Sequence, residues 1–157
     1  MTALEVILCG VIVIGTFLFM EFVAWFTHKY IMHGFLWVWH ESHHKKHDHA
    51  LEKNDLFAVV FSIPSAGLIY YSTSVVQAPY LTAVGIGILC YGIFYFVFHD
   101  VIVHQRIKFK VKNKSKYLKR MINAHYIHHK KHKKEDCEAF GFLYAPKKFE
   151  ERKVIDS

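Results

Sequence analysis

The chain has 157 residues, enough for one domain, and 53% of them are hydrophobic although the formal net charge is +7. Its three cysteines are far apart and form no CxxC pair, which argues against a disulfide framework or a cysteine-ligated zinc site. The low glycine and proline counts exclude collagen-like and disordered chains. The sequence therefore predicts a small membrane protein with a polar, histidine-rich part.

Three apolar runs are long enough to cross a membrane as helices. They cover residues 3–26, 56–76 and 80–98, and at about 1.5 Å per residue they match the roughly 30 Å hydrocarbon core. Pro64 lies inside the second run and predicts a kink, whereas Pro79 predicts a tight hairpin and the start of the third helix. We predict one all-α membrane domain over residues 1–157, with three to four membrane helices and a histidine-rich helical cap that holds a di-metal site.

The fourth membrane element in that range would come from two shorter apolar stretches, residues 34–39 and 139–146. Both are too short to span, so we expect them to pack at the interface or as re-entrant segments.

The positive charges predict the orientation. All 20 Lys and Arg residues fall in segments 28–55 and 99–157, which lie on one side of a three-span arrangement. By the positive-inside rule that side is cytoplasmic, so the N-terminus is expected outside and the C-terminus inside. Residues 106–116 alternate basic and apolar side chains, as in a short strand or an extended segment lying on anionic lipid. No nucleic-acid motif is present, so we expect no nucleic-acid partner.

Ten of the 13 histidines follow a spacing that occurs twice: an H-x4-H pair at the end of a predicted span, then an H-x2-H-H triplet. These are His28, His33, His40, His43 and His44, and again His99, His104, His125, His128 and His129. On a helix each triplet can point into one volume, whereas residues five apart converge only at a helix end, a kink or a π-bulge. His47, His49 and His132 have no second copy of their spacing, and we expect them to be solvated.

Imidazoles in this number predict two metal ions with about five ligands each. Imidazole binds Fe, Zn, Cu and Ni, and the scarcity of carboxylates argues against Mg, Ca and a ferritin-like centre. Three acids are candidates for orienting or lining the site: Asp100, directly after His99; Glu41, within the first triplet; and Glu21, seven residues before His28 inside the first span. A metal transporter is a rival interpretation, but its ligands should lie near the bilayer midplane rather than at the span ends.

Four motifs give the sequence a recognisable resemblance. FTHKYIMHGFLWVWHESHH (26–44), FHDVIVHQR (98–106), AHYIHHKKH (124–132) and FGFLYAPKKF (140–149) resemble the bacterial β-carotene hydroxylases, within the membrane fatty-acid hydroxylase and sterol desaturase superfamily. The resemblance covers nearly the whole chain. It maps the family's histidine boxes onto the ten histidines, and the superfamily is usually described with four spans.

The resemblance implies a non-haem di-iron monooxygenase that uses O2 and external electrons to hydroxylate carbon 3 of β-ionone rings. β-Carotene would pass through β-cryptoxanthin to zeaxanthin. The short chain leaves no room for a fused cytochrome or ferredoxin domain, which implies a separate ferredoxin-type donor with its reductase. A fatty acyl chain, a sterol or a ketolase reaction on a carotenoid are alternatives, because the same boxes serve all of them. An apolar substrate should enter from the lipid, past aromatic candidates for a wall: Trp25, Phe35, Trp37, Trp39, Phe94, Phe96, Phe98, Phe140 and Phe142.

Overall fold

The computed structural model describes residues 1–45, 51–108, 115–131 and 133–150 of the chain. Its α-helices are α1 (Ala3–Phe26), α2 (Trp37–His40), α3 (Leu56–Ser74), α4 (Pro79–Tyr95) and α5 (Lys116–His129). Helix α1 continues as a π-helix over Thr27–Phe35, and α4 continues as another over Phe96–Val103. Short 3-10 turns cover Glu41–His44, Lys53–Asp55 and Lys147–Phe149. The described ranges contain no strand, which confirms the predicted all-α class.

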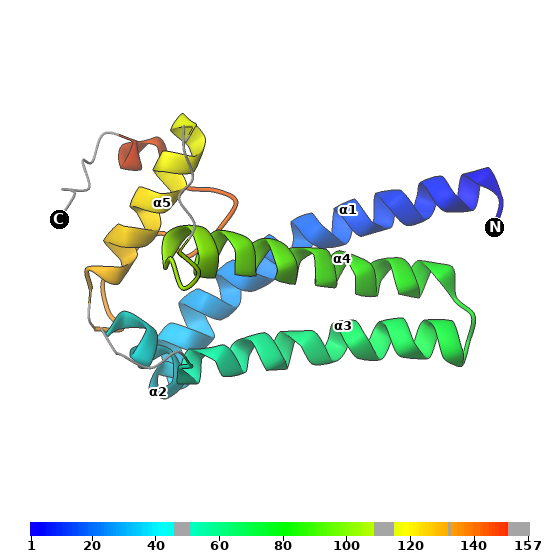
Figure 1. Cartoon of the computed structure of the whole chain (residues 1–157), viewed down its shortest axis with the longest axis horizontal. Coiled ribbons are helices and arrows are strands. Elements are labelled where there is room, and N and C mark those ends of the chain that lie inside the picture. The colour runs from blue at the N-terminus through cyan, green and yellow to red at the C-terminus, as the bar shows by residue number, and fades with distance from the viewer. Residues whose placement is uncertain (46–50, 109–114, 132, 151–157) are drawn as a thin grey trace.

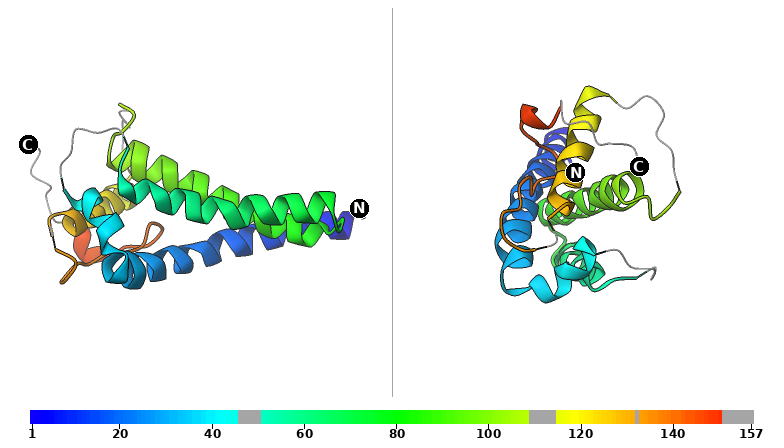
Figure 2. Two further views of the ribbon diagram at one scale, coloured as in Figure 1. Left: turned by 90° about the horizontal axis from the view of Figure 1, so that it is seen from below. Right: turned by 90° about the vertical axis from the view of Figure 1, so that its left-hand side faces the viewer.

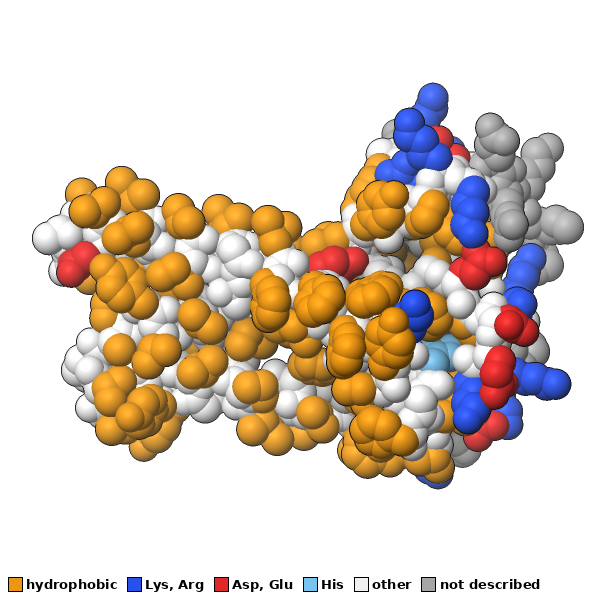
Figure 3. Space-filling model, turned by 180° about the vertical axis from the view of Figure 1, so that it is seen from behind, with side chains coloured by type: hydrophobic (Ala, Val, Ile, Leu, Met, Phe, Trp, Pro, Cys, Tyr) orange, Lys and Arg blue, Asp and Glu red, His pale blue; other side chains and the backbone are white. Residues whose placement is uncertain are grey.

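Three helical segments are long and apolar enough to cross a membrane: Ala3–Phe35, Lys53–Ser74 and Pro79–Val103. They lie roughly side by side with the N-terminus and the 74–79 hairpin at one end and the cap at the other (Figures 1 and 2). Large apolar side chains on them face outward; Leu4, Phe19 and Ile63 are 60–65% exposed. Apolar side chains cover the spans and charged ones gather at the cap (Figure 3), as expected if lipid surrounds the spans.

Helix α4 packs against both α1 and α3, and small residues let it approach each of them closely. A Cβ at Gly87 would lie 2.6 Å from Thr16 of α1, and one at Gly85 would lie 2.7 Å from Ile69 of α3. Ser65 of α3 donates a hydrogen bond to the Gly85 carbonyl at 2.9 Å. Close backbone approach and interhelical hydrogen bonds are the usual means of joining helices in lipid. Pro79 begins α4 as predicted, and α3 runs on through Pro64.

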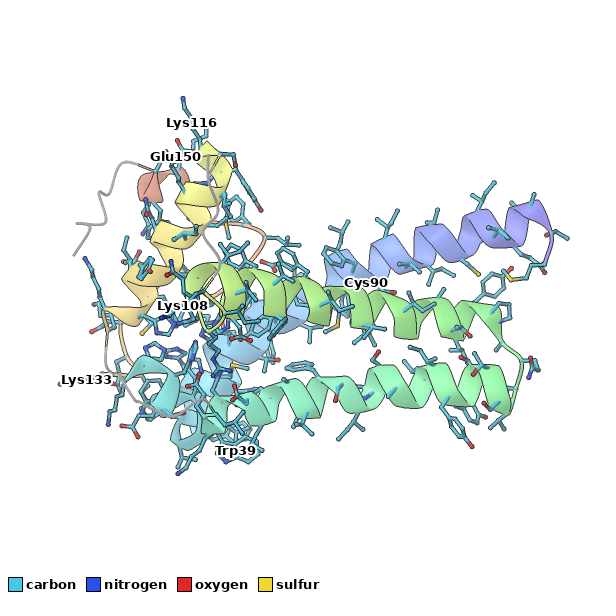
Figure 4. The ribbon with its side chains drawn as sticks, viewed as in Figure 1. Trp39, Cys90, Lys108, Lys116, Lys133 and Glu150 are labelled. Carbon is cyan, nitrogen blue, oxygen red and sulfur yellow. The ribbon has the colours of Figure 1, made fainter. Side chains whose placement is uncertain are left out.

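The cap is built from α2, α5 and the segments around them. Helix α5 starts with an N-cap at Ser115, whose hydroxyl accepts the Leu118 amide hydrogen, and buries one apolar face. That face packs into a small core with the end of α4 and the last described segment: Phe98, Val103, Met121, Ile122, Ala124, Phe142, Ala145 and Phe149. Figure 4 places the labelled Lys116, Lys133 and Glu150 at this end and Cys90 along α4. The structure therefore fixes the cap over the ends of the spans.

The two short apolar stretches and the basic stretch that were singled out from the sequence lie at the cap end of the chain or outside the described residues. Residues 139–146 form no helix; they run as an irregular segment that buries Phe142 and Ala145 against the cap. Residues 34–39 form the end of the first π-helix and the start of α2. Most of the basic stretch 106–116 lies outside the described residues, as do His47, His49 and His132.

Candidate metal centre

The ten histidines with the repeated spacing gather in two groups of five at the cap end of the spans. The first pentad is His28, His33, His40, His44 and His128; the second pentad is His43, His99, His104, His125 and His129. Within each pentad, one ring nitrogen of every member lies within 4.8 Å of the others. The pentads adjoin, since the rings of His44 and His129 stack at 4.5 Å. Eight of the ten side chains are buried, and His104 and His129 of the second pentad are half-buried.

The two π-helices explain how the H-x4-H pairs converge. Hydrogen bonds from residue i+5 to residue i place His28 and His33 on one face of the first π-helix, and His99 and His104 on one face of the second. The His104 amide donates to the His99 carbonyl at 2.9 Å, which closes this wider turn directly across the pair. The H-x4-H spacing predicted a helix end, a kink or a π-bulge at each pair, and the structure has the wider π-type turn at both.

Each H-x2-H-H triplet is divided between the pentads, which differs from the single volume expected for it. The first triplet sends His40 and His44 to the first pentad and His43 to the second; the later triplet sends His125 and His129 to the second and His128 to the first. The physical reason is the angle between side chains around a helix. Residues i and i+4 share a face, and residue i+3 lies at the edge of that face, so its side chain can join the neighbouring pentad. Each pentad thus takes four members from one half of the chain and one from the other.

The first pentad has its ring nitrogens oriented by uncharged acceptors. The Nδ1 atoms of its five members lie 2.7–3.1 Å from oxygens that only accept hydrogen bonds: the carbonyls of Phe140, Lys134, Lys131 and Glu138, and the side-chain Oδ1 of Asn54. Each Nδ1 must therefore carry the hydrogen, which leaves every Nε2 with a lone pair directed inward.

These inward lone pairs fit a cation. The Nε2 atoms of His28 and His40 are 3.1 Å apart, and so are those of His33 and His128, although neither atom of either pair carries a hydrogen to share. Two imidazole nitrogens about 2.1 Å from one ion, at right angles to each other, lie about 3.0 Å apart. A bound metal ion accounts for both the spacing and the charge that such a cluster needs.

Burial keeps the histidines neutral, which is the form that binds metal. Desolvation lowers the pKa of His40 to about 3 and that of His104 to about 4. Desolvation also lowers the pKa of His43, His125 and His128 well below 6.5, and neighbouring histidines lower it further. Protonation therefore does not compete with a metal at neutral pH.

Carboxylates surround the second pentad. His43 Nδ1 donates to Glu52 at 2.9 Å, and His99 Nδ1 donates to Asp100 at 3.0 Å. Arg106 links these acids, since it hydrogen-bonds Glu52 and Asp55 and its Nε lies 3.8 Å from Asp100. Within the described residues, His125 Nδ1 is buried without a hydrogen-bond partner.

The three acids singled out from the sequence have different positions. Asp100 contacts His99, as just described. Glu41 is exposed and pairs with Lys45 at 2.7 Å. Glu21 hydrogen-bonds the 142–143 backbone and Tyr91 instead of a histidine. Sequence reasoning missed Glu52 and Asn54, because neither follows a fixed spacing from the histidine that it contacts.

An apolar cavity of about 520 Å³ leads away from the two pentads into the membrane region. His28 and His40 of the first pentad and His99 of the second lie at one end of it. From there it extends between α1, α3 and α4, past Met20, Phe61 and Ile69. Of the nine aromatic side chains proposed as a wall, Phe96 and Phe142 line it.

The cavity reaches the outer surface of the spans. Its lining includes exposed residues of α3 (Ala58, Ser62 and Ala66), of α4 (Leu89 and Ile93) and of the π-helix that follows α4 (Phe96). An apolar molecule can therefore pass between these helices from lipid to the pentads without crossing the charged cap.

The chain is similar in sequence to one protein family and to several known hydroxylases. The family model described as fatty acid hydroxylase matches residues 13–146. A β-carotene hydroxylase of a Paracoccus species is 45% identical over 136 residues, 86% of this chain and 83% of that protein. One from Pantoea ananas is 47% identical over 137 residues, 87% of this chain and 77% of that protein. The chloroplastic β-carotene 3-hydroxylase 2 of Arabidopsis thaliana is 36% identical over 141 residues, 88% of this chain and 46% of that protein. No solved structure matches significantly.

Proposed function

Because this chain belongs to the fatty acid hydroxylase family, we propose that it is an O2-dependent hydroxylase of carotenoid β-ionone rings. It hydroxylates ring carbon 3 and converts β-carotene through β-cryptoxanthin to zeaxanthin. The structural observation that supports a lipid hydroxylase is the apolar cavity, which joins the lipid-facing surface of the spans to both pentads, and the 45% and 47% identity to β-carotene hydroxylases supports the carotenoid substrate. The reaction inserts one oxygen atom of O2 into a C–H bond and reduces the other to water with two electrons and two protons.

In this proposal the ten histidines hold two iron ions, one in each pentad. Iron supplies the activation of O2, which no side chain of the chain can perform. The protein's own contribution is to orient the ligands: each Nδ1 acceptor of the first pentad fixes a ring so that its Nε2 faces the ion. Imidazole-rich sites also bind zinc, so the metal content of purified protein is part of the test.

The cavity positions the substrate and keeps water from the reacting carbon. Its lining is almost wholly apolar, and the buried ring of Phe142 lies where it can meet a substrate beside His28 and His99, with ring centroids 5.8 and 5.6 Å away. Placing one ring end next to the metals gives the orientation that selects a single carbon. The carotenoid's length is comparable with the roughly 30 Å membrane core, so its other end remains among the lipid chains.

The cap is the side on which we place the electron donor. The carbonyls of the exposed residues Lys131 and Lys134 accept hydrogen bonds from His44 and His33, so these two surface positions are directly connected to ligands of the first pentad. Lysines along this surface favour an acidic donor such as a ferredoxin, served by its own reductase. The same basic end favours contact with anionic lipid and a cytoplasmic orientation in a bacterial inner membrane.

Expression in cells that accumulate β-carotene, followed by pigment chromatography, tests the proposal. The wild-type chain should yield β-cryptoxanthin and zeaxanthin. His43→Ala and His128→Ala each remove one ligand from a different pentad, so each should abolish both products. His49→Ala is the matched control, because His49 has no place in the repeated spacing and should leave the products unchanged.

Unchanged β-carotene from wild-type protein, present in the membrane and supplied with a reductant, would refute carotenoid hydroxylation. Fatty acyl and sterol substrates would then be assayed, together with the iron content of the purified protein. A keto product in place of zeaxanthin would assign the ketolase reaction instead.

A further inference from the structure

The two pentads are built alike, which makes their differences informative. Each contains an H-x4-H pair on a π-helix, positions i and i+4 of one triplet, and position i+3 of the other. His28 in the first pentad therefore corresponds to His99 in the second, and His128 corresponds to His43. A difference between corresponding residues cannot be explained by the histidine pattern itself, so it must come from the surrounding chain.

The corresponding residues differ in the charge of their hydrogen-bond partners. His28 and His128 donate to the neutral carbonyls of Phe140 and Glu138, at 3.0 and 2.9 Å. At the corresponding places, His99 and His43 donate to the carboxylates of Asp100 and Glu52, at 3.0 and 2.9 Å. The distances match, so the contrast lies in charge and not in geometry.

Arg106 reduces this negative charge without cancelling it. One guanidinium faces three carboxylates, those of Glu52, Asp55 and Asp100. The Glu52 side chain is only 3% exposed, so water screens its charge weakly. The second pentad thus keeps a net negative surrounding that the first pentad, with its carbonyl and amide partners, does not have.

We infer that the two metal positions are inequivalent, and that the second pentad binds a divalent metal more tightly and fills first. A carboxylate that accepts the Nδ1 hydrogen makes the imidazole a stronger donor at Nε2, and its negative charge attracts the ion. Removing such a partner typically weakens metal binding by about 10–100-fold. The inference rests on the proposed function, since it takes the pentads to be the two metal sites.

Anaerobic titration of the metal-free, detergent-solubilised full chain with Co(II) tests the inference through the metal's own absorption bands. Two binding steps are expected. His104→Ala should abolish the tighter step, whereas His33→Ala, the corresponding change in the first pentad, should abolish the weaker step and preserve the tighter one. Glu52→Gln and Asp100→Asn should each weaken the tighter step by about 10–100-fold and leave the weaker step unchanged.

Asp55→Asn is the matched control. It makes the same change of charge within the Arg106 cluster, yet in the described part of the chain Asp55 contacts no histidine, so it should change the tighter step far less. The amide variants are nearly isosteric with the acids, and circular dichroism identifies any that misfold. Because Glu52 and Asp100 act on different histidines, either variant alone suffices for the test.

The contrary results distinguish failure of this inference from failure of the proposed function. Two equal steps, loss of the tighter step in His33→Ala, or no effect of both amide variants would overturn the inference and leave the hydroxylase proposal standing. Failure of the wild-type chain to bind Co(II) at all would overturn both.

Discussion

Glu21 holds the 140–143 segment against the membrane helices, and replacing it predicts a large loss of stability. Its carboxylate accepts the Phe142 and Leu143 amide hydrogens at 2.8 Å each, and the Tyr91 hydroxyl hydrogen at 2.7 Å. Three elements therefore meet at one side chain: α1, α4 and the segment that carries Phe142. That segment also supplies the carbonyl of Phe140 to His28.

The magnitude follows from the bonds that each substitution removes. Glu21→Ala leaves two backbone N–H groups and the buried Tyr91 hydroxyl without this acceptor, at about 1–3 kcal/mol each, so the free energy of unfolding should fall by about 3–9 kcal/mol. Glu21→Gln keeps an oxygen for both N–H groups and an amide that can donate to Tyr91. It loses the charge assistance and the acceptor of the Tyr91 hydroxyl hydrogen, so its effect should be smaller than that of Glu21→Ala, about 1–3 kcal/mol.

Thermal unfolding in detergent measures the stability, and pigment analysis measures the hydroxylation. Glu21→Ala should lower both, because the displaced segment carries Phe142 out of the cavity wall; Glu21→Gln should retain most of both. Glu5→Ala is a control on the same helix, since Glu5 forms a capping box with exposed Thr2 at the helix start and its loss should change stability by at most about 1 kcal/mol. The reasoning is refuted if Glu21→Ala is as stable as the wild type, or if Glu21→Gln is as damaging as Glu21→Ala.

Three further predictions concern metal, pH and helix packing. Ferrous iron at about 100 times its dissociation constant should stabilise the metal-free protein by about 2.7 kcal/mol, and a chelator should reverse the rise in melting temperature. An unchanged melting temperature would contradict metal binding by the folded state. The metal-free protein should lose stability as the pH falls from 6.5 toward 4, because burial lowers the pKa of His40 to about 3 and of His104 to about 4, so the unfolded chain takes up protons that the folded chain does not. Denaturant titrations between about pH 7.5 and pH 4.5 measure this loss, and a stability that is constant or rises as the pH falls would contradict the lowered pKa values. Gly87→Leu should force α1 and α4 apart and lower the free energy of unfolding by about 1–3 kcal/mol. Thermal unfolding would compare it with Gly67→Leu, whose added Cβ meets nothing within 4 Å. Equal melting temperatures for the two variants would contradict close packing of α1 against Gly87.

The parts of this fold that depend on local sequence were predictable. The first apolar run, residues 3–26, coincides with α1, and Pro79 begins α4, because apolar length and proline geometry act within a few residues. The second run, residues 56–76, overlaps α3, which begins at Leu56 and ends at Ser74. The H-x4-H spacing indicated that the helices must distort, and π-helices occur at both pairs.

The parts that depend on distant contacts were not predictable. The histidine spacing identifies ten residues that the fold brings together, yet it does not say which five share a pentad, because that depends on how α2 and α5 face each other. Glu21 illustrates the same limit: its two backbone partners lie 121 and 122 residues further along the chain. Asn54 and Glu52 meet His40 and His43 only after the chain has turned back between α2 and α3.

The exchange of His43 and His128 couples the two halves of the chain. Residues 28–44 supply four members of the first pentad but lack the fifth, which α5 provides; residues 99–129 supply four members of the second and lack His43. A metal ion in the first pentad would therefore cross-link the π-helix that follows α1 to α5, and one in the second would cross-link the 41–44 turn to α5 and the π-helix that follows α4. Helices α1 and α4, whose π-helical continuations carry pentad members, also line the cavity together with α3. Binding of metal should consequently fix the cavity wall as well as the ligands, so that a ring carbon can be held beside the metals only in the metal-loaded form.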